Sequence, residues 1–339
     1  MINIQFFFRY KNPQFFSIEK VFDGISEQIK LQHGHEAVAH KLKMPTPNGL
    51  AHIVSHLRFT RKHAASINHI TGDIHYTILA CKKKQVNILT IHDCVLLKER
   101  SRWNLKYWLF KWGWYSLPVR KADFVTVISE NTRKELIEFT GCDPSKIRVI
   151  PNFVNDLYQY SPALFNKQLP RILFIGTTPN KNMFRLAAAL NGIPCILDIV
   201  GRPNAEQEAA LNKNNIRFET SYQLSEEQLL QKYIDCDLVA FPTTYEGFGL
   251  PIIEGQAVGR PVLTSSISPM QEVAGKAACL VEPYSVTSIR EGLTRIINDE
   301  SFRNNIIHAG LENVKKYRLN EVTDQYVELY KTAYKCKYG

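Results

Sequence analysis

Three features that assign many chains to a class at once are missing from this sequence. It has no run of the ~18 apolar residues that a membrane span needs, no CxxC pair among its seven cysteines, and no internal repeat. The cysteines are scattered and odd in number, which argues against a disulfide framework and against a zinc site. The apolar start has no charged segment before it and no cleavage site after it, so we interpret it as a β-strand. These absences predict a cytoplasmic protein that is neither exported nor threaded through a bilayer.

Acidic residues are scarce in the first half of the chain. Residues 1–150 carry 23 Lys and Arg against 12 Asp and Glu, whereas residues 151–339 carry 19 against 20. The net charge of +10 therefore belongs to the first half. Anionic lipid and nucleic acid are the usual partners of such a surface, and an ordinary basic surface is the alternative.

What the chain does contain is a repeated alternation of short apolar runs and helical segments. Runs such as 86–93, 171–176, 195–201 and 237–242 predict buried strands between helices, which is typical of an α/β protein with parallel sheets. The first half adds predicted strands at 52–56 and 69–71 and a helix over 102–117. The stretch 151–169 breaks this alternation and predicts a linker. We therefore expect domains at 1–155 and 156–317, and a last helix in 318–339 that packs back on the first domain.

One loop, "YEGFGLPIIEG" at 245–255, carries two glutamates among glycines. It follows a predicted strand, and Pro251 suits the start of a helix. The N–H groups of Gly249, Leu250 and Ile252 should then point outward and favour a phosphate. Carboxylates accept the two hydrogen bonds that a vicinal diol donates, so Glu246 and Glu254 on either side of a diphosphate would fit a nucleotide-sugar. A capping loop with two surface acids is the plain alternative.

The segment "YEGFGLPIIEGQAVGRPVLTSSISPMQEVAG" resembles the donor site of the family 4 retaining glycosyltransferases, also called glycosyl transferases group 1. The segments "LTIHD", "VISENTRKEL", "KIRVIPNFV", "FIGTTPNKN" and "LLQKYIDCDLVAFP" follow in that family's order, so the resemblance covers nearly the whole chain. It implies the GT-B fold, with two Rossmann-like domains that face a cleft. It also implies a hexosyltransferase that needs no metal and no cofactor, like those that build bacterial capsule, lipopolysaccharide and exopolysaccharide.

The resemblance assigns roles to the loop residues. It implies that Glu254 binds the nucleotide ribose, that Glu246 faces the hydroxyls of the donor sugar, and that backbone amides of Gly247, Phe248, Gly249 and Leu250 hold the diphosphate. It also implies that Lys181 contacts the diphosphate and neutralises the leaving group, a role that a metal plays in other transferases.

The chain departs from the family at Thr177, where an arginine is frequent, and at Asn180, where a second basic residue is frequent. Arg202 at the end of the next strand could supply the missing cation. The base is read in this family largely by backbone atoms, here around 221–223, which includes Tyr222.

The first half supplies a further catalytic candidate, His92, and two candidates for the acceptor side, Asp93 and Asp73. The resemblance suggests that His92 approaches the donor sugar and that Asp93 fixes nearby loops, and Asp73 could meet an acceptor hydroxyl. A strand-end histidine with a structural role is the alternative for His92. "DCD" at 235–237 matches a metal-binding Asp-x-Asp, but it lies between a predicted helix and strand, so we interpret it as a connection and expect no metal site.

The segment 100–121 combines all four tryptophans with basic residues, which suits either a bilayer interface or a core face. Its basic residues are Arg100, Arg102, Lys106, Lys111, Arg120 and Lys121. A lipid-linked glycan acceptor would explain this segment and the charge asymmetry together.

The sequence therefore predicts a transferase on the inner face of the membrane that uses a nucleotide-sugar. A GT-B epimerase is the second hypothesis, and a nucleic-acid-binding protein is the third, for which no motif appears.

Overall fold

The computed structural model describes residues 1–10, 17–45, 52–98 and 103–339. These residues form two compact units. The first contains Met1–Phe153 together with Leu319–Gly339, and the second contains Val154–Arg318. The chain therefore crosses between the units at 153–154 and again at 318–319.

The first unit is built on a parallel sheet of six strands in the order β2-β1-β3-β4-β5-β6. Its strands are β1 (Ile2–Phe8), β2 (Ala37–Lys43), β3 (Ile67–Ile70), β4 (Val86–Ile91), β5 (Phe124–Val127) and β6 (Ile147–Val149). Its helices are α1 (Ser17–Gln32), α2 (His52–His63), η2 (His75–Ala80), α3 (Val95–Lys98), α4 (Leu105–Phe110), η3 (Lys111–Ser116), α5 (Leu117–Lys121), α6 (Glu130–Thr140), η4 (Pro144–Lys146) and α14 (Leu319–Tyr338). Every residue of β4 is buried, as expected of a central strand of a parallel sheet.

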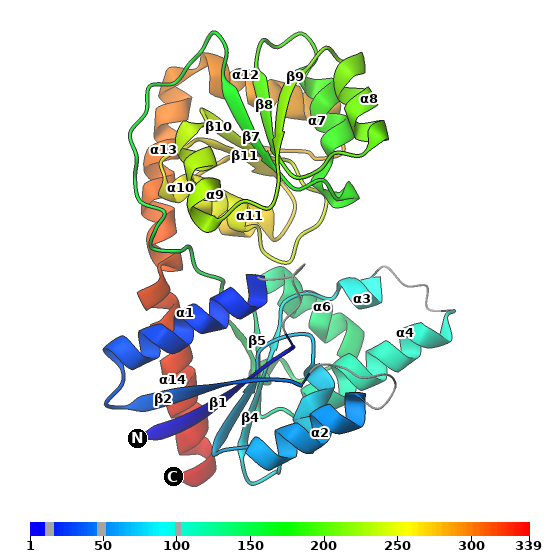
Figure 1. Ribbon diagram of the computed structural model, residues 1–339, viewed down its shortest axis with the longest axis vertical. Helices are drawn as coiled ribbons and strands as arrows, with labels where there is room; N and C mark the ends of the chain where they lie inside the picture. Colours follow the sequence, from blue (N-terminus) through cyan, green and yellow to red (C-terminus); the bar gives the residue numbers. More distant parts are fainter. Residues whose placement is uncertain (11–16, 46–51, 99–102) are drawn as a thin grey trace. The chain divides into compact units, whose positions relative to one another are not determined.

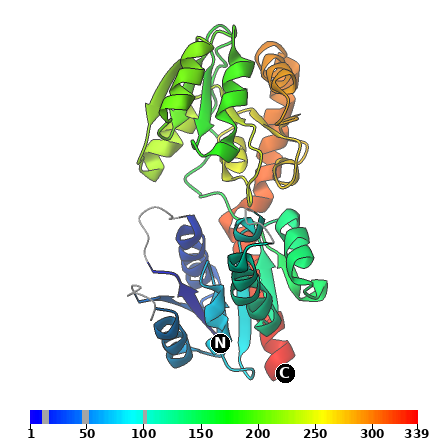
Figure 2. The same cartoon turned by 90° about the vertical axis from the view of Figure 1, so that its right-hand side faces the viewer.

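The C-terminal helix α14 completes the core of the first unit. It lies beside α1 against the sheet (Figure 1, Figure 2). The hydroxyl of Tyr330 on α14 is hydrogen-bonded to His69 Nδ1 on β3 at 2.7 Å. Phe22 of α1 packs edge-to-face on Tyr326 of α14. Burial lowers the pKa of His69 to about 3, so this imidazole stays neutral and serves the core.

Two predicted elements of the first unit are wrong. Residues 52–56 form the start of α2 rather than a strand. The apolar residues that suggested a strand, Ile53 and Val54, are exposed, whereas His56 and Thr60, one helical turn apart, are buried. His56 is satisfied there, because its ring nitrogens lie 2.7 Å from Tyr76 Oη and 2.9 Å from Pro45 O.

The helix predicted over 102–117 is also different in the structure. It is divided into α4, a π-helical turn η3, and α5. The start of the predicted segment, including Arg100 and Arg102, lies outside the described residues. No helix in the described part of the chain is both long and apolar enough to cross a bilayer. All seven cysteines lie in that part and are free.

The second unit repeats the architecture with strands in the order β12-β11-β10-β7-β8-β9, all parallel. Its strands are β7 (Arg171–Ile175), β8 (Ile196–Val200), β9 (Arg217–Ser221), β10 (Leu238–Phe241), β11 (Val262–Ser265) and β12 (Cys279–Val281). Its helices are η5 (Pro179–Lys181), α7 (Met183–Leu190), α8 (Ala205–Lys213), α9 (Glu226–Asp235), α10 (Leu250–Ala257), α11 (Met270–Ala274), α12 (Val286–Asn298), α13 (Glu300–Asn313) and η6 (Val314–Tyr317).

This strand order determines where ligand-binding residues of the second unit must gather. β10, β7, β8 and β9 are neighbours and parallel, so the loops that follow them lie at one edge of the sheet. These four loops carry the donor-binding residues that the sequence predicts, apart from Leu250 and Glu254, which lie on the helix that follows one of them.

Candidate functional site

The loop after β10 turns into α10 through a left-handed glycine. Gly249 has φ +110°, a conformation that glycine adopts readily, and the helix begins at Leu250 with Pro251 as its second residue. One expected detail is wrong: the N–H of Ile252 donates to Gly249 O at 3.0 Å instead of pointing outward. The turn is tight, and the N–H of Ile252 is therefore taken up by a hydrogen bond within the turn. The outward-pointing donors predicted at this end are thus reduced to Gly249 and Leu250.

The side chain of Phe248 anchors the loop after β10 in the core. Its side chain is buried and packs edge-to-face on Tyr317, with ring centroids 5.7 Å apart. The ring therefore belongs to the core, and only the main chain of Phe248 can serve the predicted phosphate role. Burial of this ring anchors the loop on the core of the second unit.

The structure brings Lys181 and Glu246 together, although 65 residues separate them. Lys181 Nζ donates to Glu246 Oε1 at 2.7 Å, and both side chains are largely buried. Gly176, at φ +90°, makes room for this, because a Cβ there would lie 2.8 Å from Lys181 Cε. The ammonium also lies 4.7 Å from the centroid of the Phe241 ring. The lysine is thus held at the carboxyl end of β7 and β10.

Two further residues hold Glu246, and the sequence did not assign either of them this role. Asn180 Nδ2 donates to Glu246 Oε1 at 3.1 Å and to Tyr245 O at 2.9 Å. The hydroxyl of Thr243 lies 3.0 Å from the same carboxylate oxygen and 2.7 Å from Asn180 O. The residue that departs from the family at 180 is therefore a neutral donor to the carboxylate. If Lys181 turned to a diphosphate, Asn180 and Thr243 would keep Glu246 in place.

The loops after β7 and β8 interlock beside this cluster. Gly201 lets them approach, because a Cβ there would lie 2.7 Å from Thr177 Cγ2, and Thr177 O accepts from Gln207 Nε2 at 2.8 Å. Arg202 is exposed, and its guanidinium stacks 3.6 Å from the centroid of the Tyr222 ring. An exposed cation–π contact contributes about 0.5–1 kcal/mol, less than the 1.5–3 kcal/mol of a hydrogen bond to a charged group. The stack is therefore too weak to keep Arg202 from a nearby diphosphate.

This comparison leads to a first prediction. If Arg202 replaces the cation that is missing at Thr177, Arg202→Ala should slow departure of the diphosphate and lower kcat as Lys181→Ala does. Steady-state kinetics with donor in excess measures this, and Arg217→Ala, on exposed β9, is the matched control. A fully active Arg202→Ala enzyme beside an impaired Lys181→Ala enzyme would refute the compensation.

Glu254 lies in the second turn of α10 and is half-buried. Its Oε2 accepts a 2.5 Å hydrogen bond from the hydroxyl of Tyr233 on α9. The predicted ribose-binding carboxylate is therefore present at the expected end of the unit, and a buried phenol holds it.

In the first unit, His92 and Asp93 follow β4 at the carboxyl edge of the sheet. His92 Nε2 lies 2.9 Å from Thr71 O. A carbonyl only accepts, so Nε2 is the donor of this hydrogen bond. Asp93 Oδ1 accepts from the N–H of Val95 at 3.0 Å, and burial raises the pKa of its carboxyl. Asp93 thus caps the turn into α3.

Asp73 follows β3 at the same edge, but an ion pair engages it. Arg9, at the end of β1, donates to Asp73 Oδ2 at 2.8 Å and to Glu19 Oε1 at 2.5 Å. No sequence pattern predicts this contact, because Arg9 and Asp73 lie 64 residues apart. An acceptor hydroxyl would meet an Asp73 that is already paired with a largely buried arginine. The carboxylate still has further lone pairs with which to accept a hydrogen bond.

His75 lies two residues further on and is buried. Its Nδ1 donates to Trp114 O at 2.9 Å, and within the residues that the structure describes its Nε2 has no hydrogen-bond partner. Burial lowers the pKa of this imidazole to about 4, so it stays neutral. It packs edge-to-face on Tyr115 and helps to seat η3 on the sheet.

The "DCD" segment is a connection between α9 and β10. Asp237 accepts hydrogen bonds of 2.7 Å from the N–H groups of Asn166 and Arg171, so it ties the linker and β7 together at the amino end of the strands. Among residues 1–10, 17–45, 52–98 and 103–339, no three His, Cys, Asp or Glu side chains form a group that could hold a metal ion.

The four tryptophans fall into two classes. Trp103 is 98% exposed, and Trp108 and Trp112 are each 43% exposed. Trp114 instead packs against Tyr76 with ring centroids 4.7 Å apart, and its Nε1 donates to Asp73 O. With Trp103, Trp108 and Trp112, three exposed leucines form what we call the exposed aromatic surface: Leu105, Leu109 and Leu117. Lys111 and Arg120 stack on Trp108 and Trp112.

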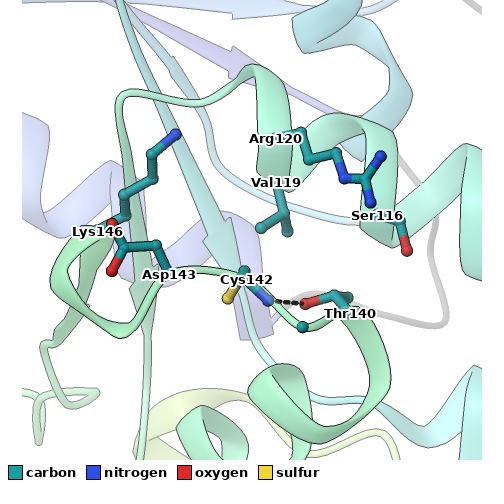
Figure 3. Close-up of a pocket in the computed structure, with 8 residues that line it drawn as sticks. Ser116, Val119, Arg120, Thr140, Cys142, Asp143 and Lys146 are labelled. Atoms are coloured by element: carbon teal, nitrogen blue, oxygen red, sulfur yellow. Dashed lines mark hydrogen bonds between the residues drawn. The ribbon is translucent and has the colours of Figure 1, made fainter.

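A pocket of about 200 Å³ in the first unit lies away from the candidate site (Figure 3). It is lined by residues that come just before β5 and β6, so it belongs to the amino edge of the sheet, opposite His92 and Asp93. Lys146 and Arg120 stand on opposite sides of it in Figure 3. Lys146 Nζ donates to Ala122 O, and the Asp143 carboxylate accepts from Ser145, so these charges are already engaged.

Comparison with known proteins agrees with this geometry. The family "Glycosyl transferases group 1" matches residues 161–313, and "Glycosyltransferase Family 4" matches residues 21–156. The serotype-specific mannosyltransferase WbdA of Escherichia coli is 27% identical over 224 residues, which are 58% of this chain and 27% of WbdA. The phosphatidyl-myo-inositol mannosyltransferase of Mycobacterium leprae is 28% identical over 222 residues, 61% of this chain and 58% of that protein.

A solved structure shows the same fold over the whole chain. HepE of Anabaena, in complex with UDP and glucose, has a TM-score of 0.76 at 16% identity, and the match covers 98% of this chain and 100% of that one. The chain spans only about a quarter of the length of the E. coli mannosyltransferases that it matches. The two family matches nonetheless cover both units, and the chain therefore belongs to the family 4 glycosyltransferases of the GT-B fold.

Proposed function

We propose that this protein moves a hexose from a nucleoside-diphosphate sugar to a hydroxyl of a growing glycan, with retention at the anomeric carbon. The observation that carries the proposal is the grouping of Lys181, Glu246 and Glu254 around the start of α10 in a chain of this family. The cation of Lys181 suits a diphosphate, and the carboxylates of Glu246 and Glu254 suit the hydroxyls of a sugar and of a ribose.

The relatives support a hexose and a lipid-linked acceptor. WbdA and the mycobacterial relative are named mannosyltransferases, and the latter name includes the lipid phosphatidyl-myo-inositol. HepE binds UDP and glucose in its crystal structure. Mannose and glucose are therefore the donor sugars that we favour, on a glycan of the O-antigen or lipopolysaccharide kind.

In the proposed mechanism, Lys181 leaves Glu246 for the diphosphate and neutralises the charge that develops as the glycosidic bond breaks. We propose that Lys181 neutralises this charge without a metal ion. Glu246, still held by Asn180, orients the sugar hydroxyls. The acceptor oxygen attacks the anomeric carbon from the face that the diphosphate leaves, and the departing phosphate takes its proton. We assign the acceptor to the first unit, with Asp93 and Asp73 at its sheet edge, and we assign His92 at the same edge to the donor sugar.

We further propose that the exposed aromatic surface docks on the cytoplasmic face of an anionic membrane. Exposed indole rings beside lysine and arginine suit the interface between headgroups and acyl chains. Each lysine or arginine near an anionic membrane contributes about 1 kcal/mol to the binding free energy, and salt weakens this attraction. Docking would bring the first unit to a lipid-linked acceptor.

The vesicle prediction follows from this assignment. Replacing Lys106, Lys111, Arg120 and Lys121 by serine should release the protein from anionic vesicles by co-sedimentation and leave donor hydrolysis unchanged. Trp112→Ser should also weaken binding, because that ring is exposed. The matched control replaces four basic residues elsewhere in the first unit by serine: Arg61, Lys82, Lys83 and Lys84. Equal release by both sets would reduce the effect to net charge, and retained binding in low salt would refute docking by this segment.

Incubation of a nucleotide-sugar without acceptor tests the proposed class. A transferase gives slow hydrolysis that a suitable acceptor diverts into product. An epimerase of the same fold would instead yield a new nucleotide-sugar, and a nucleic-acid-binding protein would leave the donor intact. Products are separated by chromatography and identified by mass and NMR.

A further inference from the structure

The tyrosine that holds Glu254 makes a short hydrogen bond in a dry environment. The Tyr233 hydroxyl donates to Glu254 Oε2 at 2.5 Å, and the whole tyrosine is buried. Burial, reinforced by the carboxylate, raises the pKa of this phenol well above its usual value, so the hydroxyl keeps its proton and remains a donor. The geometry points to Tyr233 as a positioning residue for ribose recognition, an inference that rests on the proposed function.

The ring of Tyr233 is itself fixed from a second side. Tyr158, in the linker, is buried and packs edge-to-face on it, with centroids 5.5 Å apart and planes at 76°. The main chain of Tyr158 is anchored at both ends, because its N–H donates to Asn155 O and its carbonyl accepts from Arg318 at 3.0 Å. The phenol of Tyr233 is thus held by its own helix, α9, and by the linker. It cannot move away from the Glu254 carboxylate without disturbing these two elements.

This support matters because a glutamate on a helix has several rotatable bonds. Left alone, Glu254 would sample many orientations, and ribose binding would have to select one of them. Tyr233 selects an orientation beforehand and uses one of about four acceptor positions on the carboxylate. The carboxylate can then accept from the ribose diol while the phenol holds it. Preorganisation of a binding group by a supporting hydrogen bond is the general way to gain affinity of this kind.

The expected signature is a loss of discrimination, not a uniform loss of binding. Only a ligand with a ribose diol profits from an oriented Glu254. Tyr233→Phe should therefore weaken binding of the ribose nucleotide by about three- to ten-fold, the cost of ordering one flexible side chain. Binding of the 2′,3′-dideoxy counterpart should not change. A merely structural tyrosine would move both affinities alike.

The test titrates the whole protein by calorimetry with GDP, UDP and ADP, and then with the 2′,3′-dideoxy form of the one that binds most tightly. Glu254→Ala should abolish the preference for the ribose form, and Tyr233→Phe should reduce it by the factor above. Adding Tyr233→Phe to Glu254→Ala should have no further effect on the preference. Tyr160→Phe, at an exposed tyrosine of the same linker, is the matched control and should retain the preference.

The outcomes separate this inference from the proposed function. If none of the three diphosphates binds, the proposed function fails. If the preference depends on Glu254 but survives Tyr233→Phe, or if Tyr233→Phe weakens both forms equally, only the positioning role is overturned. Thermal unfolding confirms that each variant is folded. Should Tyr233→Phe not fold, Glu254→Gln keeps the test open, because it retains size but weakens the bond to the phenol, and an unchanged preference there would overturn the inference as well.

Discussion

Replacing Glu254 by alanine should weaken binding of the nucleoside diphosphate and of the intact nucleotide-sugar by the same factor, about 10- to 150-fold. Both ligands carry the ribose, and a hydrogen bond to a charged group contributes about 1.5–3 kcal/mol. Titration calorimetry with each ligand measures the two losses. Unchanged affinity for the diphosphate would remove the ribose role from Glu254.

The same substitution has a cost to the fold that needs its own control. It leaves the buried hydroxyl of Tyr233 without its partner, and an unsatisfied buried donor costs about 1–3 kcal/mol. Glu254→Ala should therefore lower the melting temperature, and adding Tyr233→Phe should restore part of it by removing the orphaned group. Binding is compared at a temperature where all variants are folded.

Replacing Glu246 by glutamine should separate binding from turnover. The variant keeps the size of the side chain but loses the charge that now pairs with Lys181. Diphosphate affinity should hold or rise slightly, because the lysine becomes available to the phosphates. Turnover should fall by about 10- to 100-fold, since the donor sugar loses a charged hydrogen-bond partner.

Kinetics of transfer, together with titration of the diphosphate alone, measure this separation. Glu291→Gln, on the exposed side of α12, is the matched control and should change neither quantity. An equal loss of affinity for the diphosphate and for the nucleotide-sugar would place Glu246 outside the sugar subsite.

The sequence predicts well those features that lie close together along the chain. Glu246, Gly249 and Glu254 belong to one loop and the helix after it, so their spacing, with a glycine and a proline between them, already implies a helix start that faces a ligand. Alternation of apolar runs likewise predicts the parallel sheets, because a strand such as β4 is buried on both faces and reads as continuously apolar.

The rest depends on contacts between distant residues, which spacing does not encode. Asn180 meets Glu246, 66 residues away, only because β7 and β10 are neighbours. Tyr233 on α9 likewise reaches Glu254 on α10 across 21 residues of sequence. Residues 52–56 suggest a strand rather than the start of α2 because their apolar residues, Ile53 and Val54, are exposed, and the buried residues of the helix are His56 and Thr60. The tryptophans at 112 and 114 look alike in sequence, yet one is exposed and the other packs on Tyr76.

A thermal-shift panel of nucleoside diphosphates and nucleotide-sugars tests the central claim most directly. A ligand at 100 times its Kd stabilises a protein by about 2.7 kcal/mol. The proposed donor site predicts that the diphosphate and the sugars of one base raise the melting temperature of the wild-type protein, and that Glu254→Ala loses the larger part of this rise. No shift with any nucleotide at millimolar concentration, or an equal shift in wild type and Glu254→Ala, would contradict the assignment of this site to a nucleotide-sugar.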